Sequence, residues 1–119
     1  GDYETAAKNF KKAGTDAAKA NLGVVDILTG DYEKAVQDLQ DVKGCCHNTV
    51  LAYILTNQLD KASKAAHCKD AKVDYLRAVI AARQGNFDQV KTWLDSVAKK
   101  DKALAERATK DIEFAEYYK

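Results

Sequence analysis

The chain has 119 residues, with 19 Lys and Arg against 18 Asp and Glu, a hydrophobic fraction of 46% and no proline. A domain of this length buries about two thirds of its unfolded surface, and the absence of proline favours helices throughout. The balanced charge argues against nucleic acid as the main partner, because phosphate binding needs a clustered basic surface. No apolar run approaches the roughly 20 residues that cross a bilayer, which argues against membrane insertion.

The first predicted element is a helix over residues 2–12, which follows directly on a turn-like Gly1-Asp2 pair. It therefore has the form of the second half of a helical hairpin, and we assign residues 1–14 to a half repeat. A first half is missing, so we expect more protein before Gly1 in the native chain. The complete lack of methionine likewise indicates a processed or excised product.

Residues 15–43 form the clearest hairpin, with helices predicted over 16–29 and 31–42. Gly30 suits the left-handed conformation that ends a helix, and Asp31 is a good cap for the next one. Apolar residues recur every three or four positions on both sides of this turn, as in amphipathic helices. They are Leu22, Val25 and Leu28, then Tyr32, Ala35, Val36, Leu39 and Val42.

Two further hairpins and one single helix are predicted after residue 43. The hairpin at 44–70 has helices over about 46–56 and 58–67, and the hairpin at 71–100 has helices over 71–84 and 86–99. A terminal helix follows at 101–118, with one apolar side and one polar side, which suits the end of a helical solenoid. Its apolar stripe is Leu104, Ala108, Ile112 and Ala115.

The hairpins repeat at a nearly constant interval. Aligning Gly1, Gly30, Asn57 and Gly85 as turn residues gives spacings of 29, 27 and 28 residues, which is the range of helical solenoids. Each turn is followed by a small or branched residue and, four positions later, by a partner that is larger in most copies. The pairs are Ala6 with Phe10, Ala35 with Leu39, Ala62 with Ala66, and Val90 with Leu94.

Leu22-Gly23, Gly30-Asp31-Tyr32 and Ala35-x-x-x-Leu39 resemble the tetratricopeptide repeat family, although Asp26 stands where that family often has tyrosine. The resemblance implies an all-α fold: an antiparallel helix-turn-helix solenoid of about eight helices in a right-handed superhelix, forming a single domain. In that family the first helices of successive hairpins line a groove that binds peptides. Transferred to this chain, the groove residues are Asn21, Val24, Leu28, His47, Asn48, Leu51, Tyr75, Val79 and Arg83. The alternative is that the protein's own structure covers them.

The cysteines suggest a second site. Cys46 and Cys68 are each eleven residues from Asn57, so they lie at the same height in an antiparallel helix pair. A Cys46–Cys68 disulfide, a metal site and free thiols all remain open here. A zinc site needs four converging ligands, whereas the consecutive Cys45, Cys46 and His47 would point about 100° apart on a helix. A disulfide would indicate a periplasmic or extracellular protein; otherwise a cytoplasmic location is expected.

No catalytic motif is visible. Ser63 and Ser96 are the only serines and neither lies in a G-x-S-x-G elbow, and the chain has no P-loop, H-E-x-x-H or dinucleotide fingerprint. We therefore expect no enzyme activity and no cofactor. The predicted function is a protein interaction or scaffold module that binds a peptide or helix of an unidentified partner protein. The alternatives are a purely structural spacer in a larger protein, for example of the cell envelope, and a thiol- or metal-responsive module.

Overall fold

A computed structural model describes residues 16–42 and 47–119. Every regular element in these ranges is a helix and none is a strand, which confirms the predicted all-α class. The predicted helix at 2–12, and Cys45 and Cys46, lie outside the described residues. The chain divides into two compact units, Gly1–Ala65 and Ala66–Lys119, each of which is described by itself below.

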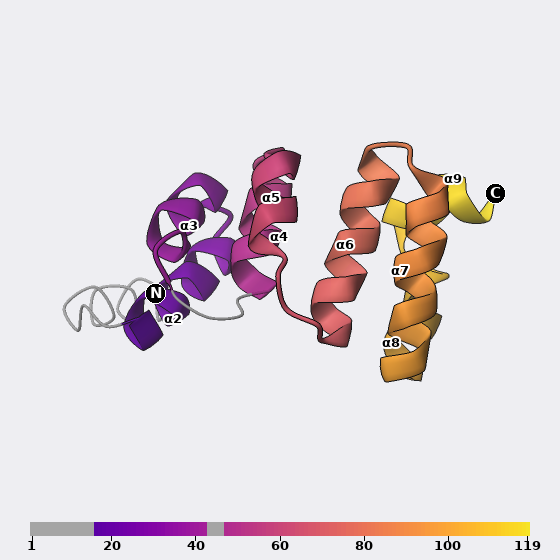
Figure 1. Cartoon of the computed structure of the whole chain (residues 1–119). Coiled ribbons are helices and arrows are strands. Elements are labelled where there is room, and N and C mark those ends of the chain that lie inside the picture. Colours follow the sequence, from indigo (N-terminus) through magenta and orange to yellow (C-terminus); the bar gives the residue numbers. More distant parts are fainter. Residues whose placement is uncertain (1–15, 43–46) are drawn as a thin grey trace. The chain divides into compact units, whose positions relative to one another are not determined.

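The first unit contains two helical hairpins (Figure 1). Helices α2 (Asp16–Leu28) and α3 (Tyr32–Leu39) form one, and α4 (His47–Leu55) and α5 (Leu59–Ala65) form the other. Helix α4 packs against both α2 and α3, so the two hairpins share one core. One cluster of this core joins Ala35 and Leu39 of α3 to Ala52 of α4. Other buried apolar side chains of the first unit include Ala18, Leu22, Val25, Val50, Ile54 and Ala62.

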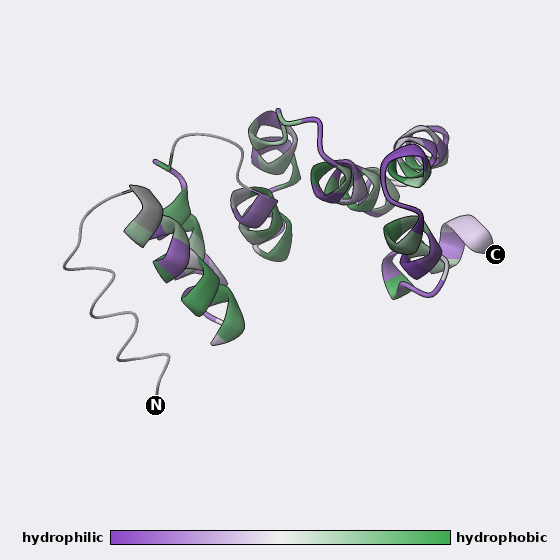
Figure 2. Cartoon of the chain, turned by 90° about the horizontal axis from the view of Figure 1, so that it is seen from below, coloured by the Kyte–Doolittle hydropathy of each residue, from purple (hydrophilic) through white to green (hydrophobic). Residues whose placement is uncertain are grey.

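The second unit begins with a hairpin of two longer helices, α6 (Ala71–Arg83) and α7 (Phe87–Lys100), which lie antiparallel and side by side (Figure 1). Helix α8 (Lys102–Ala108), the 3-10 helix η1 (Ile112–Phe114) and α9 (Ala115–Tyr118) follow. Helix α8 packs on α7, whereas η1 packs on α6. Figure 2 shows hydrophobic and hydrophilic residues mixed along these helices. Helix α6 is buried on more than one side, since Val73, Leu76, Ala78, Val79 and Ile80 are all buried.

The three described turns have the same backbone geometry. Gly30, Asn57 and Gly85 all have a positive φ, of 83°, 59° and 74°. In each turn the amide of this residue donates to the carbonyl three positions back, and the next amide donates to the carbonyl five positions back from itself. This pair of bonds satisfies carbonyls that the helix end leaves without partners, and it is known as the Schellman motif. The predicted alignment of these three turns is therefore confirmed.

The residues that follow these turns also occupy matching places in the core. Ala35, Ala62 and Val90 come five positions after the turn residue, and each is 0% exposed. The partners four positions later, Leu39, Ala66 and Leu94, are buried as well. Among the described residues, the positions that the sequence alignment equates thus match both in turn geometry and in burial.

The predicted terminal helix at 101–118 is wrong, because the helix ends at Ala108. The Thr109 hydroxyl donates to the carbonyl of Glu106, and Asp111, in an extended conformation, caps η1 by accepting from the amide of Glu113. A continuous helix would have placed Ile112 in the apolar stripe. Instead Ile112 is 86% exposed and Phe114 is 0% exposed, so the break exchanges one apolar residue in the core for a larger aromatic one.

Candidate functional site

The predicted groove residues of the first unit lie on α2 and α4 and are partly accessible. On α2, Asn21 is exposed, Val24 is half-buried and Leu28 is 60% exposed. On α4, the side chains of Asn48 and Leu51 are half-buried, as is His47 at the start of the helix. The first unit therefore combines apolar side chains with amide groups, the two kinds of group that a peptide-binding surface uses.

The predicted groove residues of the second unit, Tyr75, Val79 and Arg83, share one side of α6, and the protein's own 111–114 segment covers it. The Tyr75 hydroxyl donates to the Asp111 carboxylate, and the Tyr75 ring packs edge-to-face against Phe114 with 5.4 Å between centroids. Val79 is 5% exposed.

The Arg83 guanidinium makes the most specific of these contacts. Its Nε and Nη2 atoms donate to the two carboxylate oxygens of Glu113, each at 2.9 Å. This bidentate arrangement raises the pKa of Arg83. Burial, and then the hydrogen bond to Asp111, raise the pKa of Tyr75, which keeps its hydroxyl proton available for donation. Of the two interpretations of the groove, coverage by the protein's own chain thus applies to α6.

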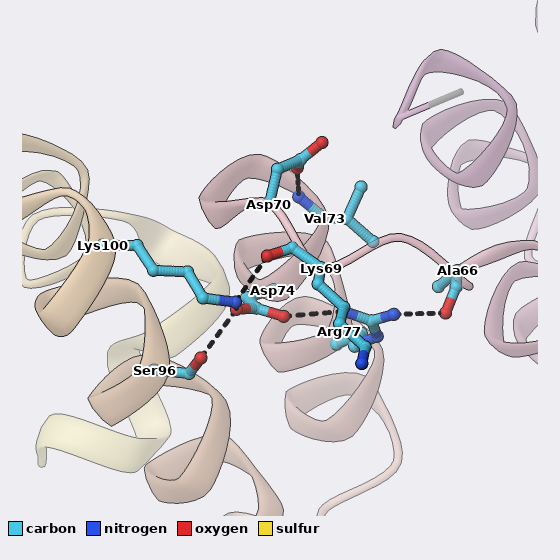
Figure 3. Close-up of polar contacts among 8 residues, drawn as sticks. All are labelled: Ala66, Lys69, Asp70, Val73, Asp74, Arg77, Ser96 and Lys100. Atoms are coloured by element: carbon cyan, nitrogen blue, oxygen red, sulfur yellow. Dashed lines mark hydrogen bonds and ion pairs between the residues drawn. The ribbon is translucent and has the colours of Figure 1, made fainter. Parts of the chain in front are cut away.

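A buried ion-pair network lies near the N-terminal end of α6, around Asp74 (Figure 3). Asp74 is 1% exposed, and its carboxylate accepts from Arg77 Nη1 at 2.6 Å, Ser96 Oγ at 2.7 Å and Lys100 Nζ at 2.7 Å. Burial alone would raise the pKa of Asp74, but the hydrogen bonds from Lys100, Ser96 and Arg77 outweigh it, so the pKa lies below its ordinary value. A carboxylate held this way has both oxygens occupied and is poorly suited to act as a general base.

The same network fixes the segment that leads into α6 (Figure 3). Arg77 Nη2 donates to the carbonyl of Ala66 at 2.6 Å, and Lys100 Nζ donates to the carbonyl of Lys69 at 2.5 Å. The Arg77 guanidinium also lies 4.9 Å from the centre of the Trp93 ring, within range of a cation–π interaction. Residues 66–69 are thereby anchored at both ends, and we assign the Asp74 network a structural role.

Cys68 lies within this anchored segment and is disulfide-bonded. Its predicted partner, Cys46, lies outside the described residues, so the Cys46–Cys68 pairing stays a prediction. His67 is exposed beside Cys68. Across residues 16–42 and 47–119, no group of three or more His, Cys, Asp or Glu side chains is placed to hold a metal ion.

A pair of carboxyl groups in the first unit was not foreseen. Asp26 of α2 is 3% exposed and lies within hydrogen-bonding reach of Asp38 of α3, and Lys34 Nζ is 4.0 Å from the Asp26 carboxylate. One oxygen of each carboxyl group, Oδ2, is buried without a hydrogen-bond partner. Burial first, and then the neighbouring Asp38, raise the pKa of Asp26 to about 7. Asp26 therefore keeps its proton up to about pH 7.

Comparison of the chain with known protein families, with curated proteins and with solved structures finds no match. Among the described residues, no helix is long and apolar enough to cross a bilayer. The resemblance to tetratricopeptide repeats therefore rests on the residues quoted above.

Proposed function

We propose that this chain is a non-catalytic helical-repeat module that binds a peptide or helix of a partner protein. The observation that carries the proposal is the shared geometry of the turns at Gly30, Asn57 and Gly85, with small or branched residues buried five positions later. Equivalent hairpins of this kind are the unit from which solenoids are built, and solenoids offer extended binding surfaces. With the tetratricopeptide resemblance, this favours an antiparallel solenoid as the arrangement of the hairpins.

The α2 and α4 residues of the first unit supply the chemistry that peptide binding requires. Leu28 is 60% exposed and Leu51 is half-buried, so both can anchor an apolar side chain of a partner. Asn21 and Asn48 carry amide groups that can donate to and accept from a peptide backbone. Since the chain carries a formal net charge of +1, shape and apolar contact rather than long-range attraction would determine affinity.

A selection experiment tests this proposal. The full chain is screened against a library of displayed peptides, and selected peptides are titrated against the full chain and against a Leu28→Asp variant. We expect Leu28→Asp to weaken binding about tenfold or more, because it places a charge in an apolar contact. The matched control is Gln37→Asp, a change at an exposed position of the second helix α3, which should leave the affinity unchanged.

Two results would count against the proposal. Failure to select any peptide that binds the folded chain would favour the structural spacer. Selected peptides that bind the Leu28→Asp and Gln37→Asp variants equally well would place the binding surface elsewhere.

A further inference from the structure

The 111–114 segment is bound to α6 in the manner of a peptide ligand. It is a single 3-10 turn, and such short turns have little stability of their own. Ile112, in the middle of the segment, is 86% exposed. Thr109 and Lys110, which precede the segment, are exposed as well. Side-chain contacts with α6 therefore add to the cap and the backbone bonds of this short turn in holding the segment in place.

These contacts define a recognition pattern. Three of the four residues contact α6 specifically: Asp111 accepts from the Tyr75 hydroxyl, Glu113 accepts two hydrogen bonds from Arg83, and Phe114 packs on the Tyr75 ring. A bidentate carboxylate–guanidinium contact fixes both position and orientation, and a fully buried aromatic ring supplies the anchor. The residues of α6 thus select the order acidic, any, acidic, aromatic.

We propose that the Tyr75–Val79–Arg83 side of α6 binds partner peptides with this acidic–x–acidic–aromatic pattern, and that residues 111–114 are its intramolecular occupant. This inference rests on the proposed function and names its partner chemistry and its regulation. A partner peptide makes the same contacts as the internal segment. Its aromatic ring occupies the position of Phe114, and its carboxylates accept hydrogen bonds from Tyr75 and Arg83.

The covalent connection through Thr109 and Lys110 gives the internal segment an advantage over a free peptide. A short tether corresponds to an effective concentration in the millimolar range, so a free peptide competes only when it binds more tightly or when the internal contact is weakened. The internal segment is therefore autoinhibitory. It occupies this side of α6 until a partner peptide with matching chemistry displaces it, and other peptides cannot bind there.

The test uses the full chain and a labelled synthetic peptide with the sequence of residues 109–118. A Glu113→Arg variant of the chain weakens the internal contact, since it replaces the bidentate pair by a like charge facing Arg83, while Phe114 remains. We expect the peptide to bind Glu113→Arg about tenfold more tightly than the wild-type chain. Amide NMR shifts around Tyr75 and Arg83 would locate the binding.

Specificity is tested by charge exchange. Arg83→Glu alone, in a chain that keeps Glu113, also weakens the internal contact, because it sets two carboxylates against each other. This variant should not bind the natural peptide and should bind a peptide whose position 113 is Arg. A peptide with Ala in place of Phe114 should bind at least tenfold more weakly, because the aromatic anchor is missing. A chain with Asp60→Arg, which changes an exposed carboxylate on α5, is the control and should behave as wild type.

The proposal is overturned if the peptide fails to bind folded Glu113→Arg at millimolar concentration, or if its binding survives Arg83→Glu. These failures are distinguishable from failure of the proposed function. If library peptides bind in a way that depends on Leu28, the proposed interaction function holds even when the peptide test fails. The 111–114 segment would then be a permanent part of the fold.

Discussion

Gly23 of α2 lies directly against Leu39 of α3. A Cβ atom added to Gly23 would come 2.3 Å from Cγ of Leu39, far inside normal contact distance. Leu39 is 0% exposed and cannot swing into solvent. The missing side chain at position 23 thus allows α2 and α3 to approach each other closely. This explains why glycine suits the position after Leu22 in this hairpin.

Gly23→Ala is therefore expected to destabilise the protein. The 2.3 Å approach to a buried side chain places the overpacking cost at the upper end of its usual range of about 1–3 kcal/mol. The better helix propensity of alanine returns about 1 kcal/mol, so we expect a net loss of about 2 kcal/mol. Urea denaturation would measure this loss. Asn21→Ala, on the exposed side of the same helix, is the control and should change stability by less than about 0.5 kcal/mol. An unchanged or higher stability for Gly23→Ala would refute the close helix contact.

The shared turn geometry predicts a pattern of substitutions at the turn residues. Gly30→Ala and Gly85→Ala should each cost about 1–2 kcal/mol, because both positions have positive φ that alanine disfavours. Asn57→Gly should be neutral or slightly stabilising, since glycine adopts this conformation without strain. Thermal unfolding of the three variants checks the pattern, and a Gly30→Ala or Gly85→Ala variant as stable as wild type would contradict the common turn.

The Asp26–Asp38 pair predicts an unusual dependence of stability on pH. The folded protein holds a proton on Asp26 up to pH about 7, whereas in the unfolded chain the group has its ordinary pKa of 3.8. The folded state thus binds more protons, and the free energy of unfolding falls as the pH rises from about 4 to about 7, by up to about 4 kcal/mol.

Replacing Asp26 by Asn removes the ionisation and keeps the shape. The Asp26→Asn variant should be more stable than wild type at pH 8, and the fall in stability between pH 5 and pH 8 should largely disappear. Asp41→Asn, at an exposed carboxylate outside the helices, serves as control and should retain the wild-type profile. A variant that keeps the same pH dependence would show that another group causes it.

The Asp74 network predicts a large effect from a single carboxylate. Asp74→Ala leaves Arg77 and Lys100 without their buried acceptor, and breaking such pairs costs about 3–5 kcal/mol. Asp95→Ala is the matched control, because Asp95 also pairs with a lysine, at 2.9 Å, but is 60% exposed; we expect a cost below about 1 kcal/mol. Similar losses in chemical denaturation of the two variants would show that burial does not strengthen the Asp74 contacts.

The disulfide at Cys68 predicts the number of reactive thiols. Denatured, unreduced protein should expose one thiol, and reduction should raise this to three. If the partner is Cys46, then Cys45→Ser leaves no free thiol before reduction, whereas Cys46→Ser breaks the bond. Three free thiols in the unreduced wild type would exclude the disulfide, and a free thiol in unreduced Cys45→Ser would exclude Cys46 as partner.

Local sequence signals placed the helices and turns well. The spacing of apolar residues and the turn residues located each helix of the three described hairpins to within three residues at either end. These signals are local: Gly30, Asn57 and Gly85 each end a helix through contacts within five residues. The apolar stripe also identified buried positions such as Ala35, Ala62 and Val90.

Features that depend on distant partners were not predictable in the same way. Residues 101–118 have an acceptable helical pattern. The local bonds at Thr109 and Asp111 end the helix, and the contacts of Asp111, Glu113 and Phe114 with α6 hold the chain in the broken form. Asp74 and Arg77 have the spacing of a helical ion pair, but the participation of Ser96 and Lys100 depends on how α6 packs against α7. The sequence did contain a sign that Asp26 is unusual, because the tetratricopeptide repeats that it resembles often have tyrosine at this position. Nothing in the sequence distinguished its partner Asp38 from the acidic residues on the surface.

The proposed interaction function is tested most directly by equilibrium binding of a library-selected peptide to the full chain and its Leu28→Asp variant. We expect saturable binding to the full chain and about tenfold weaker binding to the variant, with the affinity of Gln37→Asp equal to that of wild type. Equal affinities for all three chains, or no selected peptide at all, would contradict a peptide-binding surface on the first helices.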